Sequence, residues 1–200
     1  MKHLYLLTLC VILCALPVQA QLTARQVLDK TMAVLDKDKG YSADMQIKAV
    51  GFKFQVSVAV RGEQAFFRTE DGEMYASGST SYAYDKKKNT VTISNRKKEE
   101  KMQMDMSSTF NTGYDVTMEK AEGGYLLRFK KLKGNKTKNA PSSAEMLVNA
   151  QNFHPKTVRV KMGIISSTIT YSNIKTGIPV QQVTYSLQRY PGASVVDKRN

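Results

Sequence analysis

The feature that most constrains the fold is an alternation of apolar and polar side chains that begins near Tyr41. Within residues 52–61, phenylalanine and valine hold the even positions, whereas lysine, glutamine, serine or arginine hold most odd ones. A period of two places successive side chains on opposite faces of a strand. The pattern predicts an all-β antiparallel sheet of meander type, without a helix of crossover length between its strands. The later predicted strands are TVTIS, YLLRFK, TVRVKM, STITYS and QVTYSL, separated by turn sequences such as EDGE, EGG and KGNK.

One convincing helix precedes the sheet, within residues 23–40. Thr23 and Gln26 have the spacing of a capping box, and Gly40 is a natural stop. One helix cannot cover the apolar face of a sheet of roughly nine or more strands. The sheet therefore either closes on its own core or curls around an apolar cavity with partial lids. The helix has one apolar side, formed by Val27, Leu28, Met32 and Leu35.

A methionine-rich stretch, MQMDMSSTF, occupies residues 102–110 and has the clear periodicity of neither a strand nor a helix. Methionine is unbranched and polarizable, so it suits surfaces that pack against variable partners. Taken alone, the stretch is compatible with ordinary core filling. Together with the incompletely covered sheet, it suggests a deformable second lid over the mouth of a cavity.

The first twenty residues, MKHLYLLTLCVILCALPVQA, have the layout of a secretory signal peptide. A basic start leads into an apolar run over residues 4–16 and then into a small-residue site. We expect cleavage after Ala20, and we expect residues 21–200 to form a single domain.

Cleavage would remove both cysteines and leave His154 as the sole histidine, just before Pro155 at a turn or strand start. This composition argues against thiol chemistry, a zinc site and a Ser-His-Asp triad. We therefore expect that the protein is not an enzyme and that it binds neither a cofactor nor a metal ion.

The charge of the chain is strongly positive, with 30 Lys and Arg against 17 Asp and Glu and a net charge of +13. Such a balance suits nucleic acid, an anionic membrane surface or an acidic partner. Export and the scattering of the lysines away from aromatic residues argue against nucleic acid. The remaining interpretations are a solvated face and a weak attraction to anionic headgroups or to a partner protein.

Five segments, in order, are QVLDKTMAVLDK, VAVRGEQAFFR, SGSTSYAYDKKKNTVTIS, GYDVTMEKAEGGYLLRF and VTYSLQRYPGASVVDKRN. Their order and spacing resemble the first helix, basic strand, hairpin, later strand pair and C-terminal ending of the LolA family, the periplasmic carriers of outer-membrane lipoproteins. The resemblance covers nearly all of residues 22–199 and is greatest to the divergent branch from Bacteroides-like bacteria.

The resemblance implies a mainly β fold, a curved incomplete antiparallel β-barrel with helices covering its open concave side. It also implies a monomeric periplasmic chaperone that holds the acyl chains of lipoproteins in an apolar cavity. Cargo would pass from an inner-membrane lipoprotein-releasing transporter to an outer-membrane acceptor. An alternative is a lipid- or lipoprotein-sensing regulatory module of the same fold, and a third is an exported enzyme.

The residue that best matches a family motif is Arg61. The resemblance implies that its guanidinium hydrogen-bonds carbonyl groups of the lid and holds the empty state closed; the alternative is a solvent-facing arginine in a turn. It is followed by Gly62 instead of the more usual proline. The residues predicted to line the cavity, each of which could equally be core, are Phe54, Val56, Val58, Phe66, Phe67, Tyr82, Tyr84, Met102, Met104, Met106 and Phe110.

Overall fold

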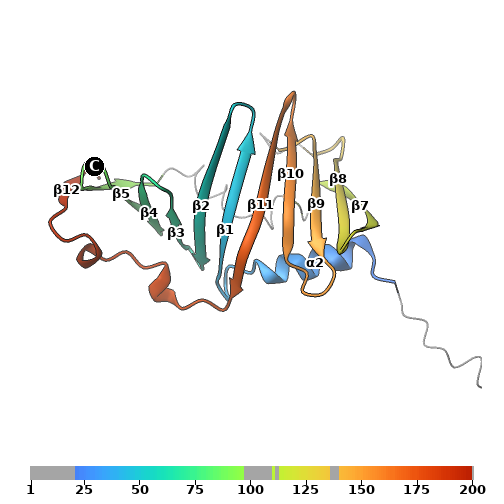
Figure 1. Ribbon diagram of the computed structural model, residues 1–200, viewed down its shortest axis with the longest axis horizontal. Coiled ribbons are helices and arrows are strands. Elements are labelled where there is room, and N and C mark those ends of the chain that lie inside the picture. Colours follow the sequence, from blue (N-terminus) through green and yellow to red (C-terminus); the bar gives the residue numbers. More distant parts are fainter. Residues whose placement is uncertain (1–20, 97–109, 111–112, 136–139, 200) are drawn as a thin grey trace, which may run out of the picture.

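The computed structural model describes residues 21–96, 110, 113–135 and 140–199. Within these residues, helix α2 (Ala24–Val34) precedes twelve strands that belong to one sheet (Figure 1). The strands are β1 (Tyr41–Ala49), β2 (Phe52–Arg61), β3 (Gln64–Arg68), β4 (Gly72–Ser77), β5 (Thr80–Asp85), β6 (Thr90–Asn95), β7 (Tyr114–Ala121), β8 (Gly124–Lys131), β9 (Ser143–Asn149), β10 (Pro155–Met162), β11 (Ile165–Thr176) and β12 (Ser194–Asp197).

The sheet consists of two antiparallel ribbons, β1–β6 and β7–β11, that join where β1 pairs with β11. The exception to antiparallel pairing is β12, which lies parallel to β6. The outermost strands, β12 and β7, are not paired with each other, so the described strands form an open sheet. The predicted mainly β, antiparallel architecture is confirmed, and of the two predicted outcomes the incomplete barrel is the one adopted.

The helix begins with the predicted capping box. The Thr23 hydroxyl accepts from the backbone N–H of Gln26, and the Gln26 side chain accepts from the backbone N–H of Thr23. The predicted stop at Gly40 is wrong, because α2 already ends at Val34. Gly40 instead closes the turn before β1 with a φ of 80°, and an added Cβ would lie 3.0 Å from Cγ1 of Ile178. No helix in the described part of the chain is long and apolar enough to span a membrane.

The two faces of the sheet carry separate hydrophobic clusters. We call the face that packs against α2 the inner face and the opposite one the outer face. The helix buries the apolar side predicted for it, Val27, Leu28, Met32 and Leu35, against the inner face. The inner-face strand residues of this cluster include Val58, Val60, Leu127, Phe129, Met146, Val148 and Val158.

The outer face of β2–β6 is covered by what we call the C-terminal segment, residues 178–193. It contains two 3₁₀ turns, Val180–Gln182 and Leu187–Arg189. The predicted strand QVTYSL is therefore wrong. Alternate side chains of this segment do face the sheet, because Val183 and Tyr185 pack on it. Its backbone begins as a 3₁₀ turn, however, because the N–H groups of Gln182 and Val183 bond to carbonyl groups three residues earlier.

Candidate functional site

The inner face carries a continuous apolar row across seven strands. Cross-strand partners place one side chain from each of β2, β1, β11, β10, β9, β8 and β7 in register. Side chains directly opposite in neighbouring strands lie on the same face and in contact distance. The row consists of Phe54, Ile47, Ile169, Val158, Met146, Leu127 and Met118.

The solvent exposure of the side chains in this row increases from the β8–β9 end to the β2 end. Leu127 and Met146, at the end near α2, are fully buried. Ile169 and Ile47 are half-buried, and Phe54 is 44% exposed. Phe52 extends the open end, because its ring stacks on Phe54 with centroids 6.0 Å apart. Among the described residues, α2 therefore covers one end of an apolar surface whose other end is accessible.

Five of the predicted cavity residues lie on or against the inner face. Phe54, Val56 and Val58 alternate along β2, and Phe67 lies opposite Val58 on β3. Phe110 is buried in the inner cluster, 4.7 Å from the ring of Phe129. Whether they line a cavity stays a prediction. Met102, Met104 and Met106 lie outside the described residues.

The other three predicted cavity residues, Phe66, Tyr82 and Tyr84, lie on the outer face. Phe66 and Phe67 are consecutive in one strand, so they point to opposite sides of the sheet. The two tyrosines stack on the C-terminal segment, Tyr82 on Tyr185 at 4.0 Å and Tyr84 on Tyr190 at 4.3 Å. These three side chains cannot line the same cavity as the inner-face residues.

Arg61 is the last residue of β2, and its guanidinium donates a hydrogen bond to the carbonyl oxygen of Ile178. It thus anchors the C-terminal segment just after that segment leaves β11. Its expected bonds to carbonyl groups of the lid stay a prediction, and the candidate second lid, with the methionines at 102, 104 and 106, lies outside the described residues. Gly62, the residue after Arg61, has a φ of 60°, which proline cannot adopt.

A polar tether fixes the C-terminal segment, and sequence reasoning missed it. The carboxylate of Glu73 on β4 accepts from the hydroxyl of Tyr190 and from Nε of Arg68 at 2.7 Å. Nη1 of Arg189 donates to the hydroxyl of Tyr75 at 2.7 Å. Burial tends to raise the pKa of Glu73, but hydrogen bonds from Tyr190 and Arg68 outweigh it and hold that pKa below its ordinary value.

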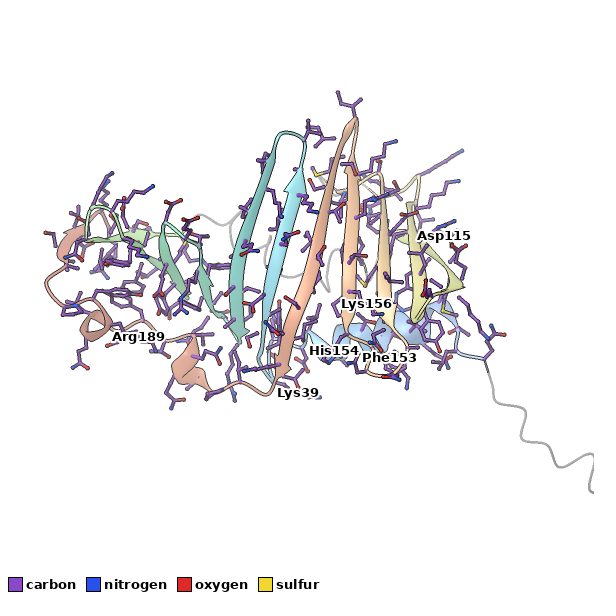
Figure 2. All side chains as sticks on the ribbon, in the orientation of Figure 1. Lys39, Asp115, Phe153, His154, Lys156 and Arg189 are labelled. Atoms are coloured by element: carbon purple, nitrogen blue, oxygen red, sulfur yellow. The ribbon has the colours of Figure 1, made fainter. Side chains whose placement is uncertain are left out.

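The histidine of the described part of the chain, His154, has a structural position. His154 immediately precedes β10, as predicted, and Figure 2 places it with Phe153 at the lower end of that strand, near α2. Nζ of Lys30 on the helix lies 4.7 Å from the ring centroid of Phe153. In the described part of the chain, no group of three or more His, Cys, Asp or Glu residues could hold a metal ion.

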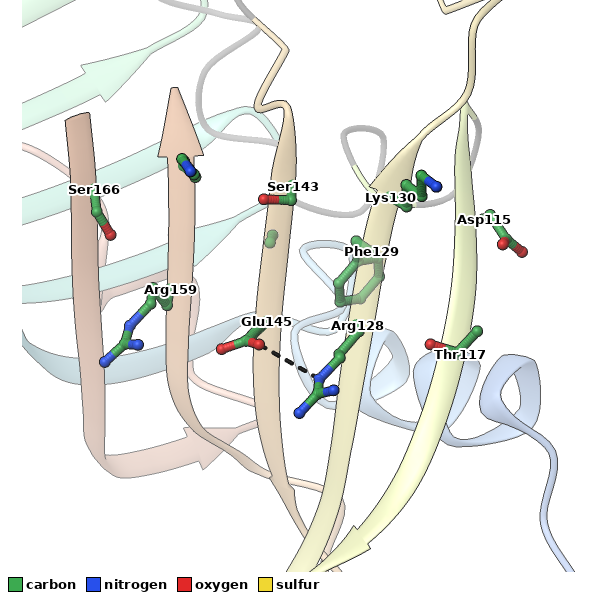
Figure 3. A pocket seen from close by; sticks show the side chains of 11 residues that line it. Asp115, Thr117, Arg128, Phe129, Lys130, Ser143, Glu145, Arg159 and Ser166 are labelled. Carbon is green, nitrogen blue, oxygen red and sulfur yellow. Dashed lines mark ion pairs between the residues drawn. The ribbon is translucent and has the colours of Figure 1, made fainter. Parts of the chain in front are cut away.

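The outer face of β7–β11 is polar, in contrast to the inner face. A groove of about 510 Å³ lies there and is lined mainly by charged and hydroxyl side chains, with Phe129 and Ala144 among them (Figure 3). Arg128 pairs there with Glu119 at 2.8 Å and with Glu145 at 3.4 Å. Charged side chains dominate this groove, whereas the inner face carries the continuous apolar row, so the inner face is the better candidate site.

Comparison with solved structures shows that the fold is shared with distant proteins. The chain is similar to an uncharacterized conserved protein from Thermus thermophilus, with 14% identity and a TM-score of 0.53, over 88% of this chain and 99% of that one. It is also similar to LprF from Mycobacterium bovis, with 11% identity and a TM-score of 0.50, over 81% and 96%. Comparison with curated proteins finds no match.

Comparison with protein families gives a more specific result. Residues 15–164 match the family described as outer membrane lipoprotein carrier protein LolA. The matched range contains α2 and strands β1–β10, including the inner-face residues of β2, β8, β9 and β10. Since the match spans well over half of the chain, the protein belongs to the LolA family of outer membrane lipoprotein carrier proteins.

Proposed function

We propose that the protein is a periplasmic carrier that binds the acyl chains of lipoproteins on its inner face. It takes them from an inner-membrane releasing transporter to an outer-membrane acceptor and catalyses no reaction. Membership of the LolA family supports this role. The single observation that carries it is the apolar row that α2 covers at one end and leaves accessible at Phe54.

The accessible end of the row suits reversible binding. Each methylene group that leaves water contributes about 0.8 kcal/mol, so part of one acyl chain is enough for firm holding. We propose that Phe54, Val56, Val58 and Phe67 contact the chain and that Phe110 supports the covered end. The methionines at positions 102, 104 and 106 would form a deformable second lid, consistent with the flexibility of their side chains.

The remaining parts of the proposal concern the mature protein. Residues 1–20 act as a cleaved signal peptide, and residues 21–200 act as one domain and as a monomer. The chain belongs to the divergent, Bacteroides-type branch of the family.

The test is a calorimetric titration of residues 21–200 with a soluble triacylated lipopeptide and with its unacylated twin. We expect saturable binding of the acylated form alone. Phe54→Asp puts a charge into the open end of the row and should weaken binding at least about tenfold, or ~1.4 kcal/mol. Leu187→Asp is the matched control, because Leu187 is similarly exposed, at 46% against 44%, but lies on the C-terminal segment.

Two results would contradict the proposal. Folded protein that binds neither peptide would show that the inner face is a filled core. Equal affinity of the Phe54→Asp variant and the unmodified protein would place acyl binding elsewhere on the molecule.

A further inference from the structure

Two apolar hairpin tips project side by side from the end of the sheet opposite α2 (Figure 1). We call residues 50–51, between β1 and β2, and residues 163–164, between β10 and β11, the two tips. They are neighbours because β1 pairs with β11. Val50 is 76% exposed and Ile164 is 99% exposed. The adjoining strand residues Phe52, Met162 and Ile165 are exposed as well.

The exposed side chains at the tips lie outside the paired part of the sheet. Gly51 and Gly163 have φ values of 83° and 60° and make both turns tight, so the neighbouring Val50 and Ile164 stand beyond the last paired residues. A turn is normally polar, and an aliphatic side chain held fully in water loses the free energy that burial would supply. Two such turns next to each other indicate a surface that becomes buried against something outside the chain.

Cations lie directly behind the tips, on the outer face. Lys48 and Lys53 are cross-strand partners, and Lys48 is also paired with Thr168, which is paired with Arg159. Like charges directly opposite each other destabilise a sheet, so this arrangement favours an anion from outside. Lys161 lies one step nearer the second tip. None of these four cations takes part in an ion pair between described residues.

We propose that the two tips dock the protein on an anionic lipid bilayer, with Val50 and Ile164 entering the boundary between headgroups and acyl chains and the cations contacting lipid phosphates. Lys48 precedes Val50 by two residues, and Lys53 follows Gly51 by two. Two residues of strand span about 7 Å, which matches the ~5–10 Å depth to which interfacial segments are buried.

The shape of this surface favours a bilayer over a protein partner. A stable protein interface needs a broad, complementary patch of about 800 Å² on each side, with an apolar centre and a polar rim. Here the apolar residues occupy two narrow turns, and the cations lie behind them in layers. Docking does not depend on acyl-chain binding, because Val50 and Ile164 stand in turns beyond the inner-face row.

The absence of tryptophan from the whole sequence makes a direct test possible. In residues 21–200, Ile164→Trp introduces a single fluorescent reporter at the second tip. We expect its emission to shift to the blue with phosphatidylglycerol-containing vesicles and to be quenched by lipids brominated near the headgroup end of the acyl chain. Pure phosphatidylcholine vesicles should have a much smaller effect. Leu187→Trp, the matched control, should respond to neither.

A second variant tests the cations. Replacing Lys48, Lys53 and Lys161 together with glutamine should reduce partitioning into the anionic vesicles at least about tenfold, since each nearby lysine strengthens binding to an anionic surface. The same variant should bind the soluble lipopeptide with unchanged affinity. In the unmodified protein, vesicle binding without lipopeptide binding would count against the acyl-chain site and leave membrane docking standing.

Three outcomes would overturn the docking proposal. One is a folded Ile164→Trp variant whose emission does not change with anionic vesicles. Another is an equal change in the Leu187→Trp control. The third is binding of the tips to a purified transporter or acceptor protein without any binding to vesicles, which would make them a protein interface.

Discussion

At the scale of single residues, Arg61 connects two parts of the chain that are far apart in the sequence. Its guanidinium bonds the carbonyl of Ile178, 117 residues away, and its Cβ and Cγ lie 3.2 Å from where a Cβ on Gly40 would be. A half-buried hydrogen bond from a charged group contributes about 1.5–3 kcal/mol to stability. Arg61 is therefore a point where the end of β2, the turn before β1 and the C-terminal segment are held together.

Arg61→Leu should release the start of the C-terminal segment, because leucine cannot donate to the Ile178 carbonyl. We expect faster amide hydrogen exchange around residues 178–183 and a free energy of unfolding lower by about 1–3 kcal/mol. Arg61→Lys keeps a charged donor but not the planar fork. Its amide exchange and its free energy of unfolding should lie between those of the unmodified protein and those of Arg61→Leu. Unchanged exchange would rule out the anchor, and unchanged apolar-dye binding and lipid retention would contradict the predicted role as a lid latch.

At the scale of elements, the C-terminal segment depends on one carboxylate for part of its attachment. Glu73 has an ordinary pKa of 4.5, and its hydrogen bonds in the folded protein lower that pKa. A carboxyl group whose pKa is lower in the folded state than in the unfolded state stabilises the fold at pH values above its unfolded pKa. That contribution is lost as the pH falls through the folded pKa.

The free energy of unfolding should therefore decline as the pH falls below about 4.5, and Glu73→Gln should reduce the decline. Urea unfolding of both proteins between about pH 6 and 3 measures the difference. Asp29→Asn is the matched control, because Asp29 forms an exposed ion pair with Arg25 at 3.1 Å. A pH profile that Glu73→Gln leaves unaltered would show that the tether contributes nothing to acid sensitivity.

Elements formed by interactions between residues close in the sequence could be predicted, whereas features that depend on distant residues could not. The strands and the start of α2 were predictable because alternation and capping act within a few residues. QVTYSL misleads because an extended segment lying on an apolar surface alternates as a strand does, although it has no ladder partner. The faces of Phe66 and Phe67 were not predictable, since alternation separates neighbours without saying which of them meets the helix. The tether of Glu73 to Tyr190 joins residues 117 apart and leaves no local pattern.

At the scale of the whole molecule, the two ribbons are united by β11. This strand begins at Ile165, one residue after the family match ends at 164. It pairs with β1 on one side and with β10 on the other. The inner-face row, and with it the candidate site, is continuous only because Ile169 of β11 links Ile47 to Val158.

A chain of residues 21–164 should therefore lack a cooperative unfolding transition, since neither ribbon can complete the core beneath α2. The matched control is residues 21–177, which keeps β11 and loses the C-terminal segment and β12. We expect this longer chain to unfold cooperatively, with a lower midpoint than the full-length mature protein. Thermal denaturation followed by circular dichroism makes the comparison, and a cooperative transition in the shorter chain would show that the ribbons fold independently.

The pairing of the first strand with the eleventh also affects how the protein folds. Contacts between residues 41–48 and 168–176 are among the most distant in the sheet, and contacts of high sequence separation slow folding. Until β11 has been synthesised, the backbone of β1 presents an unpaired edge, and such edges template aggregation between chains. The growing polypeptide therefore has a long period of vulnerability that ends only when residue 176 is in place.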